Sequence, residues 1–298
     1  MSAAPPLVSI AMPVMNAART LGPALRSILA QTHENWELLV IDDGSTDGTA
    51  ALVAALGDAR VRLTIGGGNL GLAARLNQAI DMANGPLIAR MDADDLAFPG
   101  RIEAQVKFMA EHPDCDLVGC GMLFFDDAGE VLGRFPVRRT HAEICARPWS
   151  GFHLPHPTWL GKKEWFARFR YLAGYRKTQD QDLLLRTFDQ SRFACIDQVL
   201  LGYRQDRRTL GKLLAGRAYF ARSILRESWR RHDFGAGISG LAEQALKAAV
   251  DLLTLPAGLH RLVRGERRGA LSAAEEARWR AVWADCGAGH GTNSTSRS

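Results

Sequence analysis

The chain has 298 residues, of which 47% are hydrophobic and 23% are charged, a composition that excludes a chain disordered throughout its length. It shows neither a secretion-signal pattern nor the roughly 18 uninterrupted apolar residues of a membrane span, and its five cysteines lack CxxC spacing, so we expect a cytoplasmic protein without disulfides or structural zinc. The net charge is only +5, but basic residues concentrate between positions 204 and 231.

Residues 1–115 alternate apolar strands with helical patterns, as the βαβ units of a parallel sheet do. We predict strands at 7–14, 36–41, 61–65 and 86–91, and helices at 21–31 and from Asn69 to about Ala83. Acidic clusters end two of these strands, Asp42-Asp43 after the second and Asp92-Ala93-Asp94-Asp95 after the fourth. Because ligands bind outside the carboxyl ends of parallel strands, both clusters should face one cleft.

After residue 115 the pattern changes. Apolar runs at 116–125 and 131–135 flank a turn and predict a hairpin, and short helices, a helix at 180–190 and a strand at 198–203 follow. Beyond residue 210 the chain should be almost wholly helical. We therefore predict two halves of one α/β domain (1–115 and 116–209), a basic helical region (210–286) and a disordered tail (287–298).

The acidic turn after the fourth strand is the most informative element. Where the strand breaks into a turn, the carboxylates of Asp92 and Asp94 can converge, with Asp95 nearby. Such hard oxygen ligands suit Mn²⁺ or Mg²⁺, which would bridge diphosphate oxygens and neutralise charge on a leaving nucleoside diphosphate. Acidic turns are common, however, so this one alone is weak support for a metal site.

Several motifs in fixed order strengthen the interpretation. They are Pro13-Val14-Met15-Asn16, Ser27-Ile28-Leu29-Ala30-Gln31-Thr32, the run from Val40 to Thr49, Asn69-Leu70-Gly71, Arg75-Leu76-Asn77 and Asp92-Ala93-Asp94-Asp95. In these motifs, over roughly residues 7–204, the chain resembles glycosyltransferase family 2. The resemblance implies a GT-A fold, a Rossmann-like mixed sheet flanked by helices, here with a C-terminal helical extension. It also implies inverting transfer of a sugar from a nucleotide sugar, usually a UDP-sugar, with a divalent cation.

The resemblance implies the following donor-binding residues: Pro13, Val14, Asn16, Asp42, Asp43, Arg75, Asp92 and Ala93. Asp94 and Asp92 would hold the metal, and Asp42 or Asp43 would accept a hydrogen bond from the base. Other interpretations stay open for some positions. A surface salt bridge is an equal alternative for Arg75, and turn formation or helix capping is an alternative for Asn16 and the preferred role of Asp47.

Inverting transfer needs a base that removes the proton of the acceptor hydroxyl. The family places this base in a Glu-Asp pair that begins a helix, and Gln179-Asp180-Gln181-Asp182-Leu183-Leu184-Leu185-Arg186 aligns with that segment. The resemblance therefore makes Asp180 the base, although Gln179 departs from the usual Glu. Asp182 is the second candidate, and helix geometry favours it as a residue of the N-terminal turn.

The loop from Trp149 to Trp159 combines aromatics, histidines and prolines, a mixture suited to binding sugars. Its segment His156-Pro157-Thr158 matches a family segment near the acceptor, so we predict acceptor contacts for His156 and Trp159, with a structural His156 as the alternative. Pro155 and Pro157 would break the helix needed to align His153 and His156 as zinc ligands.

The predicted activity is transfer to a hydroxyl of a glycan or lipid-linked saccharide in cell-surface or extracellular polysaccharide synthesis. A sugar nucleotidyltransferase is an alternative, but it would need a glycine-rich basic loop after the first strand, where only Arg19 is basic. A non-catalytic nucleotide-sugar-binding protein is another. The C-terminal helices are either a peripheral contact to the inner face of the membrane or a subdomain packed on the core. Nucleic-acid binding is disfavoured because the basic stretch lacks interleaved aromatics.

Overall fold

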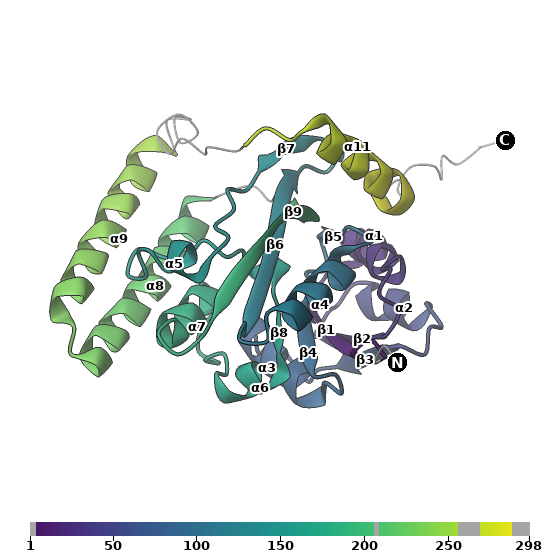
Figure 1. Cartoon of the computed structure of the whole chain (residues 1–298), viewed down its shortest axis with the longest axis horizontal. Helices are drawn as coiled ribbons and strands as arrows, with labels where there is room; N and C mark the ends of the chain where they lie inside the picture. Colours follow the sequence, from purple (N-terminus) through teal and green to yellow (C-terminus); the bar gives the residue numbers. More distant parts are fainter. Residues whose placement is uncertain (1–3, 206–208, 256–268, 288–298) are drawn as a thin grey trace.

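A computed structural model describes residues 4–205, 209–255 and 269–287 of the chain (Figure 1). Within these ranges a nine-stranded sheet has the order β3-β2-β1-β4-β8-β6-β9-β5, with β7 paired to β6. Helices flank the sheet, and α8 and α9 form a long pair at one end of the molecule (Figure 1). None of the described helices combines the length and the apolar character that crossing a membrane requires.

The first part of the sheet is parallel, as the alternating patterns predict. It comprises β3 (Val61–Ile65), β2 (Trp36–Asp42), β1 (Val8–Val14) and β4 (Leu87–Arg90). Alternate residues of β2 enter two hydrophobic clusters on opposite faces, Leu38 and Val40 in one cluster and Leu39 and Ile41 in the other. Burial on both faces explains why these strands are continuous apolar runs in the sequence.

The register of these strands brings their carboxyl ends to one edge. Val14 lies beside Asp42 in the pairing of β1 with β2, and Ala11 lies beside Arg90 in the pairing of β1 with β4. The turns that follow β1, β2 and β4 therefore meet at the same place. This edge is where a parallel sheet binds its ligands.

The second part of the sheet is mixed. It comprises β5 (Leu96–Ala97), β6 (Leu117–Phe125), β7 (Val131–Arg134), β8 (Leu160–Lys162) and β9 (Phe193–Arg204). The predicted hairpin is confirmed as the β6–β7 pair. Strand β9 begins earlier than predicted, because its register against β6 shifts between Cys120 and Gly121 and the polar Asp197 and Gln198 interrupt the apolar pattern there.

Short helices connect the strands. They are α1 (Ala18–Leu29), α2 (Thr49–Ala54), α3 (Leu72–Met82), α4 (Arg101–Glu111), α5 (His141–Ile144), the 3₁₀ turn η1 (His156–Thr158), α6 (Lys163–Arg168) and α7 (Gln179–Thr187). The pairing of Leu96 with Gly202 joins β5 to the end of β9. The acidic turn between β4 and β5 is thus held against Arg204.

The C-terminal helices pack at two separate places. Helix α8 (Leu210–Arg231) lies beside α7 and packs antiparallel against α9 (Phe234–Thr254), whereas α11 (Ala273–Val282) lies beside β7 (Figure 1). Trp279 of α11 donates its indole N–H to the carbonyl of Gly129 at 2.8 Å. Gly287 is buried in the last turn, η2 (Trp283–Gly287), so the predicted disordered tail does not begin there, and the rest of it lies outside the described residues.

Candidate active site

A cavity of about 300 Å³ lies at the carboxyl ends of β1 and β4. It is lined by Pro13, Val14, Met15, Asn16, Ala17, Arg19, Thr20, Asp92, Ala93, Asp94 and Arg204. The segments 13–20 and 92–94 are far apart in the sequence, and the parallel pairing of β1 with β4 brings them together. Six of the residues predicted for the donor and the metal therefore share one cavity, while Asp42, Asp43 and Arg75 do not line it.

The acidic turn after β4 gathers three carboxylates. Asp92, Asp94 and Asp95 each offer an oxygen, and these oxygens lie within 4.8 Å of one another. Asp95 is fully buried, and its Oδ1 accepts a hydrogen bond from the backbone N–H of Arg204, whereas its Oδ2 has no partner among the described residues. Burial, with the charges of Asp94 and Asp92, raises the pKa of Asp95 well above its usual range. A buried, unpaired carboxylate oxygen beside two further carboxylates fits a divalent cation.

Arg90 is a site residue that the sequence analysis missed. It is buried at the end of β4 and donates from Nη1 and Nη2 to the two carboxylate oxygens of Asp92, at 3.0 and 2.6 Å. Both Asp92 oxygens thus accept hydrogen bonds from Arg90, so a metal bound by Asp92 would share that carboxylate with the arginine. An arginine inside an otherwise apolar strand was the available signal, because buried charges are rare unless paired.

Arg204 is the second site residue that was missed, since it was counted only as part of the basic stretch. It lines the cavity and donates from Nε to the carbonyl of Asp94 at 3.1 Å. Its Nη1 forms an ion pair with Oδ1 of Asp127 at 2.8 Å, and Nη1 of Arg19 pairs with the same oxygen at 3.0 Å. Two cations therefore border the cavity next to the acidic turn.

Asp42, the last residue of β2, and Asp43, which follows it, both form hydrogen bonds within the protein. Asp43 accepts from the backbone N–H groups of Leu70 and Gly71 and from Nε of Arg75, so both of its oxygens are in use. Arg75 forms a buried ion pair with Asp43 and not a surface salt bridge, and its predicted place near the donor stays a prediction. Asp42 uses only Oδ1, toward Gly44 and Ser45, among the hydrogen bonds of the described chain.

Asn16 and Asp47 connect the neighbouring turns. Asn16 has a positive φ of 50°, and its side-chain oxygen accepts from the backbone N–H of Thr46 at 2.9 Å. Asp47 accepts from the N–H of Ala18 at 3.0 Å and from the N–H of Thr49 at 2.9 Å, the first residues of α1 and α2. The capping role preferred for Asp47 is therefore confirmed.

Asp180 lies in the first turn of α7, which follows Thr178 in the left-handed conformation. Its Oδ2 accepts a hydrogen bond from the side-chain amide of Gln181 at 3.2 Å. Burial raises the pKa of Asp180, and the positive charge of Arg90 acts in the opposite direction. The same Arg90 also holds Asp92, so it links the predicted base electrostatically to the acidic turn.

Asp182, the second candidate for the base, is enclosed by contacts with other side chains of the protein. It is fully buried, and its oxygens bind Arg186 at 3.0 Å, Arg226 at 2.7 Å and the hydroxyl of Ser223 at 2.7 Å. These contacts fasten α7 to α8. A carboxylate enclosed by two arginines is a poor proton acceptor, so the geometry favours Asp180.

We expect Asp182→Ala to destabilise the fold by about 3–5 kcal/mol, because two arginines would lose their buried partner. Urea unfolding followed by circular dichroism measures this change. Asp189→Ala is the matched control, since it removes an exposed carboxylate that pairs with Arg231 just beyond the same helix, and it should cost at most about 1 kcal/mol. Equal effects of the two substitutions would contradict an anchoring role for Asp182.

The predicted acceptor residues lie below the surface. His156 is buried, with Nε2 hydrogen-bonded to the hydroxyl of Tyr171 at 2.8 Å, and burial with the charge of Arg90 lowers its pKa well below the usual range, so the ring is neutral. Trp159 is 0% exposed and donates its indole N–H to the carbonyl of Leu154. Its ring packs edge-on against His156. The prediction that Trp159 contacts an acceptor does not fit this enclosed position, and its role here is to support His156.

Comparison with known proteins gives consistent results. Residues 9–170 match the sequence profile of "Glycosyl transferase family 2". The chain is 37% identical over 211 residues to EpsE of Bacillus subtilis (strain 168), which is named as a glycosyltransferase, covering 67% of this chain and 74% of EpsE. It is 40% identical over 106 residues to the UDP-Glc:alpha-D-GlcNAc-diphosphoundecaprenol beta-1,3-glucosyltransferase WfgD of Escherichia coli, covering 36% of this chain and 42% of WfgD.

Among solved structures, the chain is similar to the mannosyltransferase PcManGT from Pyrobaculum calidifontis, in complex with GDP-Man and Mn²⁺. The TM-score is 0.61 at 19% identity, and the similarity covers 94% of this chain and 86% of PcManGT. The predicted GT-A fold, a mixed sheet flanked by helices with C-terminal helices added, is thereby confirmed. From the sequence profile and the relationship to EpsE, the chain belongs to glycosyl transferase family 2.

Proposed function

We propose that this glycosyltransferase is inverting and metal-dependent, and that it transfers a sugar from a UDP-sugar to a hydroxyl of a glycan or lipid-linked saccharide. The observation that carries the proposal is the buried, unpaired oxygen of Asp95 beside Asp92 and Asp94, at a cavity walled by the end of β1. The name of WfgD, with a UDP-sugar donor and a lipid diphosphate acceptor, supports the choice of donor and acceptor class.

The donor would bind in the 300 Å³ cavity. Pro13, Val14 and Asn16 would line the nucleotide. The base would extend beyond this cavity, where Asp42 is better suited than Asp43 to accept a hydrogen bond from it, because both oxygens of Asp43 are engaged. Arg204 and Arg19 are placed to attract the diphosphate. Asp94 would hold the cation, with Asp92 sharing its carboxylate between the metal and Arg90.

The bound cation would neutralise charge on the diphosphate as it leaves. Asp180 removes the proton from the acceptor hydroxyl, and the oxygen then attacks the anomeric carbon from the side opposite the diphosphate. One C–O bond forms as the bond between the anomeric carbon and the diphosphate oxygen breaks, which inverts the configuration. The partly desolvated setting of Asp180 makes it a stronger base than an exposed aspartate.

A thermal-shift screen of nucleotide sugars tests the proposal directly. We expect a UDP-sugar with Mn²⁺ to raise the apparent melting temperature, since a ligand at 100 times its Kd stabilises the native state by about 2.7 kcal/mol. GDP-sugars and UTP serve as comparisons, and each nucleotide is tested with Mn²⁺ and with EDTA. Stabilisation that is indifferent to metal would contradict metal dependence. Tight UDP binding without any donor hydrolysis would favour a non-catalytic binding protein.

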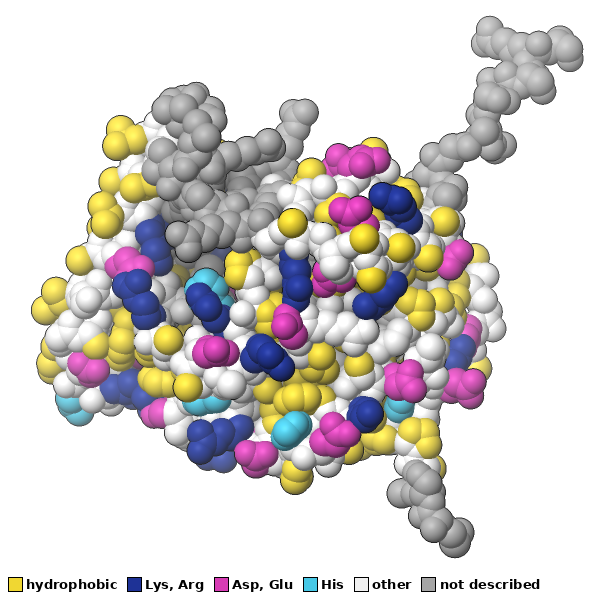
Figure 2. Space-filling model, turned by 45° about the horizontal axis from the view of Figure 1, so that its top comes forward, with side chains coloured by type: hydrophobic (Ala, Val, Ile, Leu, Met, Phe, Trp, Pro, Cys, Tyr) yellow, Lys and Arg dark blue, Asp and Glu magenta, His cyan; other side chains and the backbone are white. Residues whose placement is uncertain are grey.

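The structure changes the interpretation of the basic stretch. Arg217 pairs with Asp251, Arg226 with Asp182 and Arg231 with Asp189, so much of the positive charge is used inside the molecule, while Arg207 and Arg208 lie outside the described residues. The outward face of α9 is uncharged instead. Every exposed residue of this helix is apolar, small or a serine, and hydrophobic side chains gather at the left edge of the molecule, over α9 (Figure 2).

We infer that this face rests on an anionic membrane. On α9, Ile238 is 69% exposed and Leu253 is 75% exposed. Trp229, near the end of α8, is also 69% exposed and extends this apolar face, because its ring packs against Phe234 at the start of α9. Every exposed charged residue of the neighbouring α8 is basic, which complements anionic lipid.

Co-sedimentation with vesicles containing phosphatidylglycerol should capture the native protein, and vesicles of phosphatidylcholine alone should capture less. Trp229→Ser with Ile238→Ser should lower the bound fraction several-fold, because the substitutions remove apolar surface that binding to the membrane would bury. Leu52→Ser, on the exposed part of α2, is the control. If the native protein instead forms a dimer in solution that the double variant abolishes, a second copy covers this face and the membrane inference fails.

A further inference from the structure

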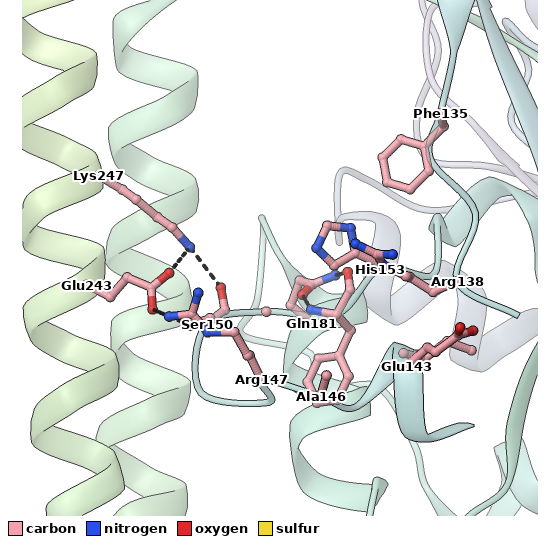
Figure 3. Close-up of a pocket in the computed structure, with 13 residues that line it drawn as sticks. Phe135, Arg138, Glu143, Ala146, Arg147, Ser150, His153, Gln181, Glu243 and Lys247 are labelled. Carbon is pink, nitrogen blue, oxygen red and sulfur yellow. Dashed lines mark hydrogen bonds and ion pairs between the residues drawn. The ribbon is translucent and has the colours of Figure 1, made fainter. Parts of the chain in front are cut away.

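A second and larger cavity, of about 680 Å³, lies between the loop 135–153 and the helices α7 and α9. Its lining includes Phe135, Arg138, Arg147, Phe152, His153 and Lys247. In Figure 3, Lys247 reaches from α9 toward Ser150, while Phe135, Arg138 and His153 lie on the opposite side. The cavity is separate from the one at the acidic turn, and part of its lining comes from the loop Trp149–Trp159, whose composition suits sugar binding.

This cavity adjoins the proposed base through Gln181. Gln181 lines the cavity, and its Oε1 accepts a hydrogen bond from the backbone N–H of Phe152 at 2.7 Å. Its Nε2 donates to Asp180 at 3.2 Å. Only the side chain of Gln181 therefore separates this part of the cavity from the carboxylate of Asp180, which would activate an acceptor.

The charges around the cavity are unbalanced toward positive. Three cations line it, and the two carboxylates are Glu143 and Glu243. Glu143 is engaged in the capping box of α5, where it accepts from the backbone N–H groups of Arg139 and Thr140. Glu243 is shared by two cations, Arg147 at 2.8 Å and Lys247 at 2.7 Å. Arg138 has no ion-pair partner among the described residues.

The environment of His153 is consistent with a positive field inside the cavity. Burial lowers the pKa of His153, and the charges of Arg138 and Lys247 lower it further. The ring is thus neutral near pH 7 and can donate or accept a hydrogen bond. Phe135 packs against it, with ring centroids 6.3 Å apart, and together with Phe152 it offers apolar surface suited to a sugar ring.

We propose that this cavity is the acceptor subsite and that it selects an acceptor carrying a phosphoryl group on its sugar, bound by Lys247, Arg147 and Arg138. The inference rests on the proposed function, because the cavity is assigned to the acceptor by its proximity to Asp180, the proposed base. A phosphoryl group carries more charge than a carboxylate and can be shared by several cations, which matches three cations around one cavity. Glu243 competes with this ligand for Arg147 and Lys247.

Because Glu243 would compete with the phosphoryl group for the same cations, substitutions of Lys247 and Glu243 should have opposite effects on ligand affinity. Lys247→Met should weaken binding of glucose 1-phosphate about tenfold, because one charged contact is lost. Glu243→Gln should strengthen it several-fold, since it removes the negative charge that Arg147 and Lys247 share while keeping a polar side chain beside Ser150. A purely structural role would predict weaker binding in both variants. Lys107→Met, which removes an exposed lysine of α4, is the control for overall charge and should change nothing.

Calorimetric titration of glucose 1-phosphate, glucuronate and glucose, with the donor site saturated by UDP and Mn²⁺, measures these effects. We expect glucose 1-phosphate to bind at least tenfold more tightly than either of the other two. Equal binding of glucuronate would overturn the choice of a phosphoryl group, and loss of affinity in Glu243→Gln would overturn the competition.

UDP binding by the native protein, tested first, separates this inference from the proposed function. Failure to bind UDP refutes the donor assignment. Normal UDP binding, with glucose 1-phosphate binding that is unaffected by the variants of Lys247 and Glu243, refutes only the acceptor subsite.

Discussion

Asp180→Asn is expected to lower the rate of sugar transfer by about 10²–10⁴-fold, the usual contribution of a general base. The amide has nearly the same size as the carboxylate and can keep the contact with Gln181, but it cannot accept the proton of the acceptor hydroxyl. Donor binding should be unchanged, because Asp180 does not line the cavity at the acidic turn. Single-turnover kinetics with a radiolabelled UDP-sugar, combined with calorimetry of UDP binding, separates the two effects.

Asp189→Asn is the matched control for Asp180→Asn. It alters an exposed carboxylate just beyond the same helix, in an ion pair with Arg231, and should retain nearly full activity. A rate for Asp180→Asn equal to that of the control would move the base to another residue. Loss of UDP binding in Asp180→Asn would instead indicate that the substitution disturbs the donor site through Arg90.

The pH dependence of transfer follows from the same residue. Burial raises the pKa of Asp180 above the ordinary aspartate value of 3.8. Because the base acts when deprotonated, kcat/KM should rise with pH through this raised pKa and then level off. The acidic limb should therefore lie at a higher pH than an exposed aspartate would give. This limb should be absent from the residual activity of Asp180→Asn, and its persistence would assign it to another group.

Asp94→Ala is expected to abolish metal-dependent donor turnover, with a loss of at least about 10³-fold that corresponds to roughly 4 kcal/mol. Asp94 lines the cavity, whereas the oxygens of Asp92 both accept hydrogen bonds from Arg90, so we expect that Asp92 alone does not replace Asp94 as a ligand. The folded state should persist, because Asp94 is only half-buried. Hydrolysis of UDP-sugar measured across a Mn²⁺ titration tests the loss.

Asp114→Ala provides the control for Asp94→Ala, since it removes an exposed aspartate far from the cavity, before β6. It should match the native protein at every Mn²⁺ concentration. If Asp94→Ala reaches full activity at high Mn²⁺, the residue only tunes metal affinity. If it is fully active without added metal, the metal assignment fails, and the buried oxygen of Asp95 needs another explanation.

Features that depend on local sequence were predictable. Apolar strands that end in acidic turns predicted where Asp92 and Asp94 would lie, because parallel strands align their carboxyl ends at one edge. Capping by Asp47 was predictable for a similar reason, since its contact with Thr49 spans only two residues. Such contacts are set by backbone geometry over a few positions. The pattern of residue types along the chain therefore contains enough information to identify them.

The pairing of charges was decided by tertiary structure. Arg204 meets Asp95 and Asp94 across 109 and 110 residues, and only the order of strands in the sheet, with β9 between β6 and β5, brings them together. Arg217 and Arg226 belonged to a basic stretch by composition, yet the packing of α8 on α9 and α7 gave each a carboxylate partner. Trp159 was similarly enclosed by the core. A side chain's type determines which interactions it can make, but the fold determines which partner it meets and whether solvent or substrate can reach it.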